Sequence, residues 1–333
     1  MRIAVDAMGG DYAPQEIMKG AFQAMEEGLA QVILVGDENI ILDFASDYGY
    51  NKSIEVVHAP QVIKMDESPA NALRRKRHSS IAVTTNLVKE GKADGMVSAG
   101  STGAQMAAAL LGLGRIKGIQ RPAICSLLPT LIGPRVMLDV GANVDCKPNN
   151  LVQFAIMGSI YAERVLRIKE PSVGLLNIGT EESKGNELTL AAYHLLKDAP
   201  INFIGNVEAR EMTSGATDVI VCDGFVGNSL LKFGEGIGQA VFSMLEKELQ
   251  GNLRAKLGAG LMLPAFKNIK LKMDYAEYGG APLLGVQGVS LVCHGSSKAN
   301  AIKNAVKAAV NCVKSDFVKT IAAKVQTEGV EIK

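Results

Sequence analysis

The chain has no tryptophan, and only 5% of its 333 residues are aromatic. Hydrophobic residues still make up 47% of it, so its core must consist of aliphatic side chains, alanine and methionine. That content suffices for one large α/β domain or for two lobes. No apolar run approaches the roughly 20 residues that span a bilayer, so any membrane contact is expected to be peripheral.

Neither charge sign dominates, because the net charge is only +1 at pH 7. No overall field favours nucleic acid, which we do not expect as a partner. The five cysteines lack Cys-x-x-Cys spacing and form no metal-ligand pattern with the four histidines. We therefore expect reduced thiols in a cytoplasmic protein, with no metal or other cofactor indicated. The segment Met1–Asp6 predicts a strand rather than a signal peptide.

Short β-branched runs alternate with helical stretches, which predicts an α/β fold with a mostly parallel sheet. We expect one domain over residues 1–330, divided into two lobes near 141–148. The predicted strands are Ile3–Asp6, Gln31–Gly36, Ile54–His58, Gly95–Ser98, Ala123–Leu128, Val136–Val140, Val173–Ile178, Asn202–Ile204, Val219–Cys222 and Val289–His294. The first predicted helix begins at Pro14. The other predicted helices cover Ser68–Glu90, Thr102–Lys117, Pro148–Arg164, Asn186–Lys197, Asn228–Leu249 and Ser297–Lys324.

Two helical segments carry regular apolar side chains. In the helix after Asn228, they recur with a 3.6-residue period from Leu230 to Leu245, which predicts a stripe facing the core. Residues 251–274 interleave apolar side chains with Arg254 and several lysines, and Pro264 is expected to divide them into two short helical pieces. Such a basic amphipathic hairpin could lie on an anionic lipid surface or at a dimer interface, and the two are compatible.

Six strand-like runs end in glycine-rich polar loops, several of which lead directly into a predicted helix. Ligands of parallel α/β sheets lie beyond the carboxyl ends of the strands, and free N–H groups at helix starts favour anions there. Six such loops from one sheet predict a single polar cup that binds phosphate. The loops are Asp6–Asp11, Ser98–Gly103, Asp139–Asn143, Asn177–Glu182, Asp223–Asn228 and His294–Ser297.

These loops, with Lys184–Glu187 and Phe203–Glu208, resemble the phosphate acyltransferase (PlsX) family of bacterial phospholipid synthesis, collinearly over residues 1–325. The resemblance implies a three-layer αβα fold of the isocitrate-dehydrogenase and phosphotransacetylase type, in a homodimer. It also implies conversion of acyl–acyl carrier protein and inorganic phosphate into acyl phosphate, which a membrane glycerol-phosphate acyltransferase then uses. Tyr12 and Ser101 depart from residues common in relatives, so we assign no specific amide or imidazole contact to them.

The implied chemistry is acyl transfer from a thioester to a phosphate oxygen. Phosphate near pH 7 carries about −1.5 to −2 charges, by analogy with phosphorylated side chains, and needs no strong base. The protein must hold it beside the carbonyl, stabilise the oxyanion and accommodate the thiolate. We expect direct attack in a ternary complex. A Cys293–His294 nucleophilic dyad is rejected, because the two residues are adjacent in a predicted strand and their side chains point to opposite faces.

Five residues are the candidates for catalysis. Lys184 could pair with phosphate or the oxyanion, or be a solvated loop lysine. Asn186 could donate to the same oxygens, or only cap the following helix. His294 could be the acid that protonates the thiolate, or a histidine bound within its own turn. Asp223 and Asn228 could orient groups in the cup, although Asp-Gly is also ordinary turn chemistry.

The candidates for substrate binding fall into three loops. Hydroxyl groups of Ser98, Ser101 and Thr102, and backbone groups of Gly100 and Gly103, could contact phosphate, against simple turn and cap roles. Asp139 and Asn143, and the backbone of Gly179 and Thr180, are similar candidates in two other loops. Asp6 and Asp11 would repel phosphate, so they are expected to position other groups.

The basic run Arg74–His78 could contact an acidic carrier protein, or be a solvated helix face. Other functions remain open: a phosphotransacetylase acting on coenzyme A thioesters, or a non-catalytic scaffold at the membrane. A dehydrogenase is disfavoured because Gly234–Gly238 lies in a helical pattern and not after a strand.

Overall fold

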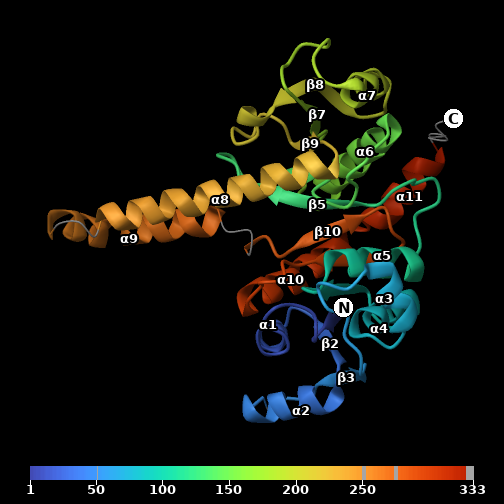
Figure 1. Ribbon diagram of the computed structural model, residues 1–333, viewed down its shortest axis with the longest axis vertical. Helices are drawn as coiled ribbons and strands as arrows, with labels where there is room; N and C mark the ends of the chain where they lie inside the picture. Colours follow the sequence, from blue (N-terminus) through green and yellow to red (C-terminus); the bar gives the residue numbers. More distant parts are fainter. Residues whose placement is uncertain (51, 250–252, 274–276, 328–333) are drawn as a thin grey trace.

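The computed structural model describes residues 1–50, 52–249, 253–273 and 277–327. They contain one 11-stranded sheet in the order β3-β2-β1-β4-β11-β10-β5-β6-β9-β7-β8 (Figure 1). The sequence pattern predicts every one of these strands except β10. The strands are β1 (Arg2–Asp6), β2 (Gln31–Gly36), β3 (Glu55–His58), β4 (Gly95–Ser98), β5 (Ala123–Leu128), β6 (Arg135–Leu138), β7 (Ser172–Asn177), β8 (Asn202–Glu208), β9 (Val219–Val221), β10 (Ala281–Leu284) and β11 (Val289–Val292).

Helices cover both faces of the sheet, so the predicted three-layer αβα fold is confirmed. One buried cluster joins one sheet face to α1, α2, α6, α7, α10 and α11. On the other face, α3, α4 and α5 cover one half, and the start of α8 contacts the other. The helices are α1 (Gln15–Glu26), α2 (Glu38–Asp47), α3 (Pro69–Arg75), α4 (Ser80–Lys89), α5 (Thr102–Gly112), α6 (Pro148–Arg164), α7 (Glu187–Lys197), α8 (Gly224–Leu249), α9 (Leu253–Met273), α10 (Ala299–Ser315) and α11 (Phe317–Thr327).

The two halves of the sheet run in opposite directions. Strands β3, β2, β1, β4 and β11 are mutually parallel, and so are β6, β9, β7 and β8. Between them, each of the three contacts β11–β10, β10–β5 and β5–β6 is antiparallel. Three reversals leave the two parallel sets pointing opposite ways. The prediction of one cup from six loops is therefore wrong. The carboxyl ends of the strands in each set lie at the edge of the sheet where the strands of the other set begin.

Strand β10 links the two halves with only four residues. Its first two residues, Ala281 and Pro282, pair with β11. Its last two, Leu283 and Leu284, pair with β5. The link is thus a narrow seam in an otherwise continuous sheet.

The predicted helix Ser68–Glu90 is wrong in one respect, since it is two helices, α3 and α4. The chain leaves the helix at Lys76, whose ammonium donates to the Val62 carbonyl at 2.8 Å and pairs with Glu67. The predicted helix Ser297–Lys324 likewise divides into α10 and α11, because Asp316 adopts a left-handed conformation with φ of 54°.

Helices α8 and α9 form a long arm that projects from the body (Figure 1). The 26 residues of α8 span about 39 Å. Leu253–Met273 is one helix with Pro264 inside it, so the prediction of two short pieces is wrong. The side chains of Arg254, Leu257 and several lysines in this segment lie outside the described residues.

The α8 stripe does not face the core, contrary to the prediction. Among the described residues of α8 after Asn228, only Leu230 and Leu231 pack against a buried cluster. Four further side chains of the stripe are exposed by 50% or more: Phe233 67%, Ile237 50%, Val241 57% and Met244 67%. On α9, Leu261 is 86% exposed. The arm thus presents apolar side chains that the described part of the chain does not cover.

Candidate active site at the start of helix α5

Three of the glycine-rich loops follow the neighbouring strands β1, β4 and β11 and form what we call the first loop group: Asp6–Asp11, Ser98–Gly103 and His294–Ser297. The backbone N–H of Asp11 donates to the Gly295 carbonyl at 2.8 Å. A Cβ atom on Gly9 would lie 2.9 Å from the Gly100 nitrogen, so glycine is required for this approach. The structure thus brings together six of the predicted site residues: Ser98, Gly100, Ser101, Thr102, Gly103 and His294.

Asp6, the last residue of β1, stabilises the first loop group through hydrogen bonds of its buried carboxylate. Its Oδ2 accepts a 2.8 Å hydrogen bond from Ser98 Oγ, and its Oδ1 accepts one of 3.2 Å from the Met8 N–H. Ser98 Oγ in turn accepts from the Gly100 N–H at 3.1 Å. Burial raises the pKa of Asp6 above its usual value, an effect that the hydrogen bonds oppose.

Helix α5 begins in this group with unpaired backbone donors. Ser101 caps it, because its Oγ accepts from the Ala104 N–H at 3.4 Å. Within the described ranges, no group accepts a hydrogen bond from the N–H of Thr102 or Gly103. Such donors, together with the helix dipole, favour an anion at this position.

A small cavity lies beside the start of α5. Its walls come from the first loop group and from two segments that the sequence did not single out: Asp6, Gly9, Val62, Ile63, Ser80, Ile81, Gly100, Ser101 and Ala104. Val62 and Ile63 precede α3, and Ser80 begins α4. The only sequence signal for these residues is the pair Ser79-Ser80, which lies inside the helix predicted over Ser68–Glu90.

His294 is exposed at the end of β11 and is held within its own turn. The Ser296 N–H donates to Nδ1 at 3.2 Å, and Ser296 Oγ lies 2.7 Å from the same nitrogen. Because Nδ1 accepts, the neutral ring carries its proton on Nε2. The adjacent Cys293 is buried, which raises its pKa to about 12 and disfavours a thiolate.

Two further loops, Asp139–Asn143 and Asp223–Asn228, form a second loop group. The carboxylate of Asp139 accepts from the N–H groups of Ile124, Ala142 and Asn143 and from Asn143 Nδ2, at 2.7–3.1 Å. Burial raises the pKa of Asp139. Asn228 lies against Gly141, and the Gly224 N–H donates to the Asn143 carbonyl at 2.8 Å. These contacts stabilise the loops; the predicted substrate contacts of these residues stay predictions.

Helices α8 and α10 differ from α5, because side chains of the chain accept hydrogen bonds from their first N–H groups. Asp223 Oδ1 accepts from the Phe225 and Val226 N–H groups of α8, both at 2.9 Å. Glu16 accepts from the Ala299 N–H of α10 at 3.0 Å. These two starts are less suited to an external anion. Helix α7 is capped as α5 is, since Asn186 Oδ1 accepts from the Thr189 N–H at 2.9 Å.

The loop after β7 holds Gly179, Thr180 and Lys184, apart from the first loop group. Asn177 Nδ2 donates to the Lys184 carbonyl at 2.9 Å. The Lys184 side chain is exposed and makes no ion pair with the part of the chain that the structure describes. Asn186 fits the capping role that the sequence left open, whereas catalytic roles for it and Lys184 stay predictions.

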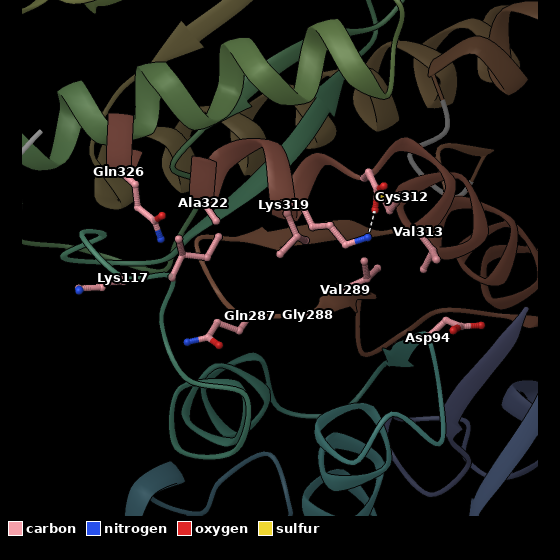
Figure 2. A pocket seen from close by; sticks show the side chains of 13 residues that line it. Asp94, Lys117, Gln287, Gly288, Val289, Cys312, Val313, Lys319, Ala322 and Gln326 are labelled. Carbon is pink, nitrogen blue, oxygen red and sulfur yellow. Dashed lines mark ion pairs between the residues drawn. The ribbon is translucent and has the colours of Figure 1, made fainter. Parts of the chain in front are cut away.

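Another cavity lies elsewhere, at the amino ends of β4 and β11. It measures about 470 Å³ and is bordered by α10 and α11, with Asp316 and Lys319 paired at 3.0 Å on its wall (Figure 2).

In the described ranges, no cluster of three His, Cys, Asp or Glu residues could hold a metal ion. Among the same described residues, no helix is long and apolar enough to cross a membrane.

The model of the family "Fatty acid synthesis protein" matches residues 1–320. The phosphate acyltransferase of Moorella thermoacetica is 62% identical over 321 residues, covering 96% of this chain and 95% of that protein. The chain belongs to the phosphate acyltransferase family. A second relative of that name, from Pelotomaculum thermopropionicum, is 54% identical over 333 residues, covering 100% of this chain and 97% of that one.

Solved structures with the same fold include two phosphotransacetylases. The EutD phosphotransacetylase from Staphylococcus aureus has a TM-score of 0.64 at 16% identity, and the enzyme from Streptococcus pyogenes has 0.65 at 18%. Each comparison covers 94% of both chains. At these identities the likeness establishes the fold, in agreement with the phosphotransacetylase type that the family resemblance implies.

Proposed function

We propose that the start of helix α5 binds inorganic phosphate and that the chain transfers an acyl group from a thioester to it. The observation that carries this proposal is the pair of unpaired N–H groups at Thr102 and Gly103. The hydroxyl groups of Ser101 and Thr102 lie on the same turn and add donors. The names of the relatives, phosphate acyltransferases, agree with an acyl acceptor of this kind.

In the proposed reaction, a phosphate oxygen attacks the thioester carbonyl carbon. A carbon–oxygen bond forms, the carbon–sulfur bond breaks, and the thiolate leaves and takes a proton from solvent. A thiol has a pKa of about 8.5, so the thiolate is a tolerable leaving group near pH 7. We place the Nε2–H of His294 beside the departing sulfur as a hydrogen-bond donor. The acid role that the sequence suggests for His294 stays a prediction.

We propose acyl–acyl carrier protein as the donor and acyl phosphate as a precursor for phospholipid synthesis, consumed by a membrane glycerol-phosphate acyltransferase. A second candidate donor is a coenzyme A thioester, which the fold shared with phosphotransacetylases favours. A scaffold without activity is disfavoured, because a scaffold has no need for an open anion site at α5.

We also propose that the chain forms a homodimer through α8 and contacts anionic lipid through α9. The exposed apolar stripe on α8 supports the first, because large exposed apolar patches mark interaction surfaces. The exposed side chains Leu261, Met262, Leu263 and Ile269 on α9 support the second.

The deciding experiment is acyl phosphate formation from inorganic phosphate, with palmitoyl–acyl carrier protein and palmitoyl–coenzyme A compared side by side. Turnover of the carrier protein alone supports the full proposal. Turnover of coenzyme A alone would change the donor and leave the phosphate site standing. A folded protein that turns over neither would overturn the proposed activity.

A further inference from the structure

Three exposed arginines lie at the end of α3 and just after it, and we call them the arginine ridge: Arg74, Arg75 and Arg77. All three side chains are exposed. The described residues supply no carboxylate that forms an ion pair with any of them. In a chain with a net charge of only +1, such a local excess is distinctive.

The break between α3 and α4 shapes this surface. In one continuous helix, four consecutive positions would spread around about 300° of the circumference. Instead, α3 ends at Arg75, and Lys76 turns inward to the Val62 carbonyl and Glu67. Lys76 is thereby neutralised, and the arginines on either side of it remain in solvent.

The arginine ridge is also close to the proposed phosphate site. At its first residue, α3 contacts the first turn of α5, since a Cβ atom on Gly103 would lie 2.8 Å from Pro69 Cγ. From Pro69 to Arg75 the helix rises about 9 Å. The chain just before α3 supplies Val62 and Ile63 to the wall of the cavity. A partner seated on the arginine ridge can therefore reach the site with a short flexible arm.

We infer that the arginine ridge is the docking surface for the protein that delivers the acyl group, an acidic carrier with the thioester at the end of an arm. This inference rests on the proposed function. Arginine suits the partner because its planar guanidinium pairs two-pronged with carboxylates. Opposite charge at such a surface accelerates encounter and fixes orientation, and it weakens as salt screens it.

The test compares the wild type with Arg74→Glu plus Arg77→Glu. The matched control is Lys169→Glu plus Lys314→Glu, which makes the same charge change at exposed lysines before β7 and at the end of α10. We expect the KM for acyl–carrier protein to rise about 10-fold in the ridge variant only. The KM for phosphate should stay within about twofold, and added salt should raise the wild-type KM but not that of the variant.

Three results would overturn the inference. One is an unchanged KM for the carrier protein in the ridge variant. Another is an equal rise in the KM for phosphate, which would mean that the loops themselves are disturbed. The third is loss of binding to phosphatidylglycerol vesicles with an unchanged KM, which would make the surface a lipid contact. A wild type that makes no acyl phosphate would instead refute the proposed function, and a binding titration with the carrier protein would then judge the arginine ridge alone.

Discussion

Ser98 Oγ donates a 2.8 Å hydrogen bond to Oδ2 of Asp6, and both side chains are buried. The same Oγ accepts from the Gly100 N–H at 3.1 Å. The hydroxyl thus ties the end of β4 to the end of β1 and sets the backbone that leads into α5. Position and orientation of the α5 donors depend on this bond, so its removal has consequences for both stability and activity.

Ser98→Ala is expected to destabilise the protein by about 1–3 kcal/mol, because it leaves the buried Asp6 with one partner fewer. We also expect a lower kcat/KM for phosphate. Denaturant titration and steady-state kinetics measure the two effects. Ser126→Ala, at a half-buried position of β5, is the control and should change neither the stability nor the kcat/KM. A Ser98 variant as active and stable as the wild type would show that the bond positions nothing.

Asp6→Asn should change the pH dependence of stability in a defined direction. Burial raises the pKa of Asp6 in the folded state above 3.8, so the folded chain binds more protons than the unfolded chain between the two values. Stability from this group is therefore lost as pH rises from 3.8 through the folded pKa. The free energy of unfolding of the wild type, relative to the variant, should fall over that window and level off above it. A constant difference across pH would contradict a raised pKa.

Gly9→Ala and Gly234→Ala should have opposite effects. At Gly9 the added methyl group would lie 2.6 Å from Asp6 Oδ2 and 2.9 Å from the Gly100 nitrogen, so we expect a loss of about 1–3 kcal/mol. At Gly234, on the exposed arm, nothing lies within 4 Å, and alanine should stabilise α8 by up to about 1 kcal/mol. Thermal or chemical unfolding distinguishes them. Equal effects would mean that the loops at Gly9 are not tightly packed.

Phe233→Glu plus Ile237→Glu should convert the proposed dimer into monomer, because no described residue covers the four exposed apolar side chains of α8. Sedimentation velocity measures the change. Gln239→Glu plus Ser243→Glu adds the same charge at exposed polar positions of α8 and should leave the dimer intact. Dimers in both variants would exclude this face of α8 as the interface.

Leu261→Glu plus Met262→Glu should weaken sedimentation with phosphatidylglycerol vesicles, because both side chains are exposed on α9. The expected loss is about 10-fold or more, since each substitution removes apolar contact and adds a charge that anionic lipid repels. Ala265→Glu plus Asn268→Glu is the matched control on the same helix. If the first pair binds vesicles as well as the wild type, with the dimer intact, α9 has no lipid role.

Local patterns identified most of the fold, and long-range contacts explain what they missed. Strand β10 escapes because its four residues include Pro282, which argues against a strand, and because its pairing is decided by β5 and β11. Without β10, the reversal of strand direction cannot be foreseen. The break at Lys76 depends on Val62 and Glu67, which are 14 and 9 positions away along the chain.

The candidate site was likewise predictable from local patterns, except where it depends on long-range contacts. Loop residues such as Ser98, Gly100 and His294 are recognisable because glycine-rich loops after strands have a characteristic composition. Which loops meet is not readable from it, since that depends on strand order. The stripe on α8 is also ambiguous in the sequence, because a 3.6-residue period looks the same whether the core or a second chain covers it.

The four-residue seam at β10 has a consequence for motion. Because each of its residues pairs with one neighbouring strand only, few backbone hydrogen bonds join the two halves of the sheet. Local opening needs the least free energy where the fewest hydrogen bonds hold, so the amides of Ala281, Leu283 and Leu284 and of their partners should exchange with deuterium before those of β1 or β7.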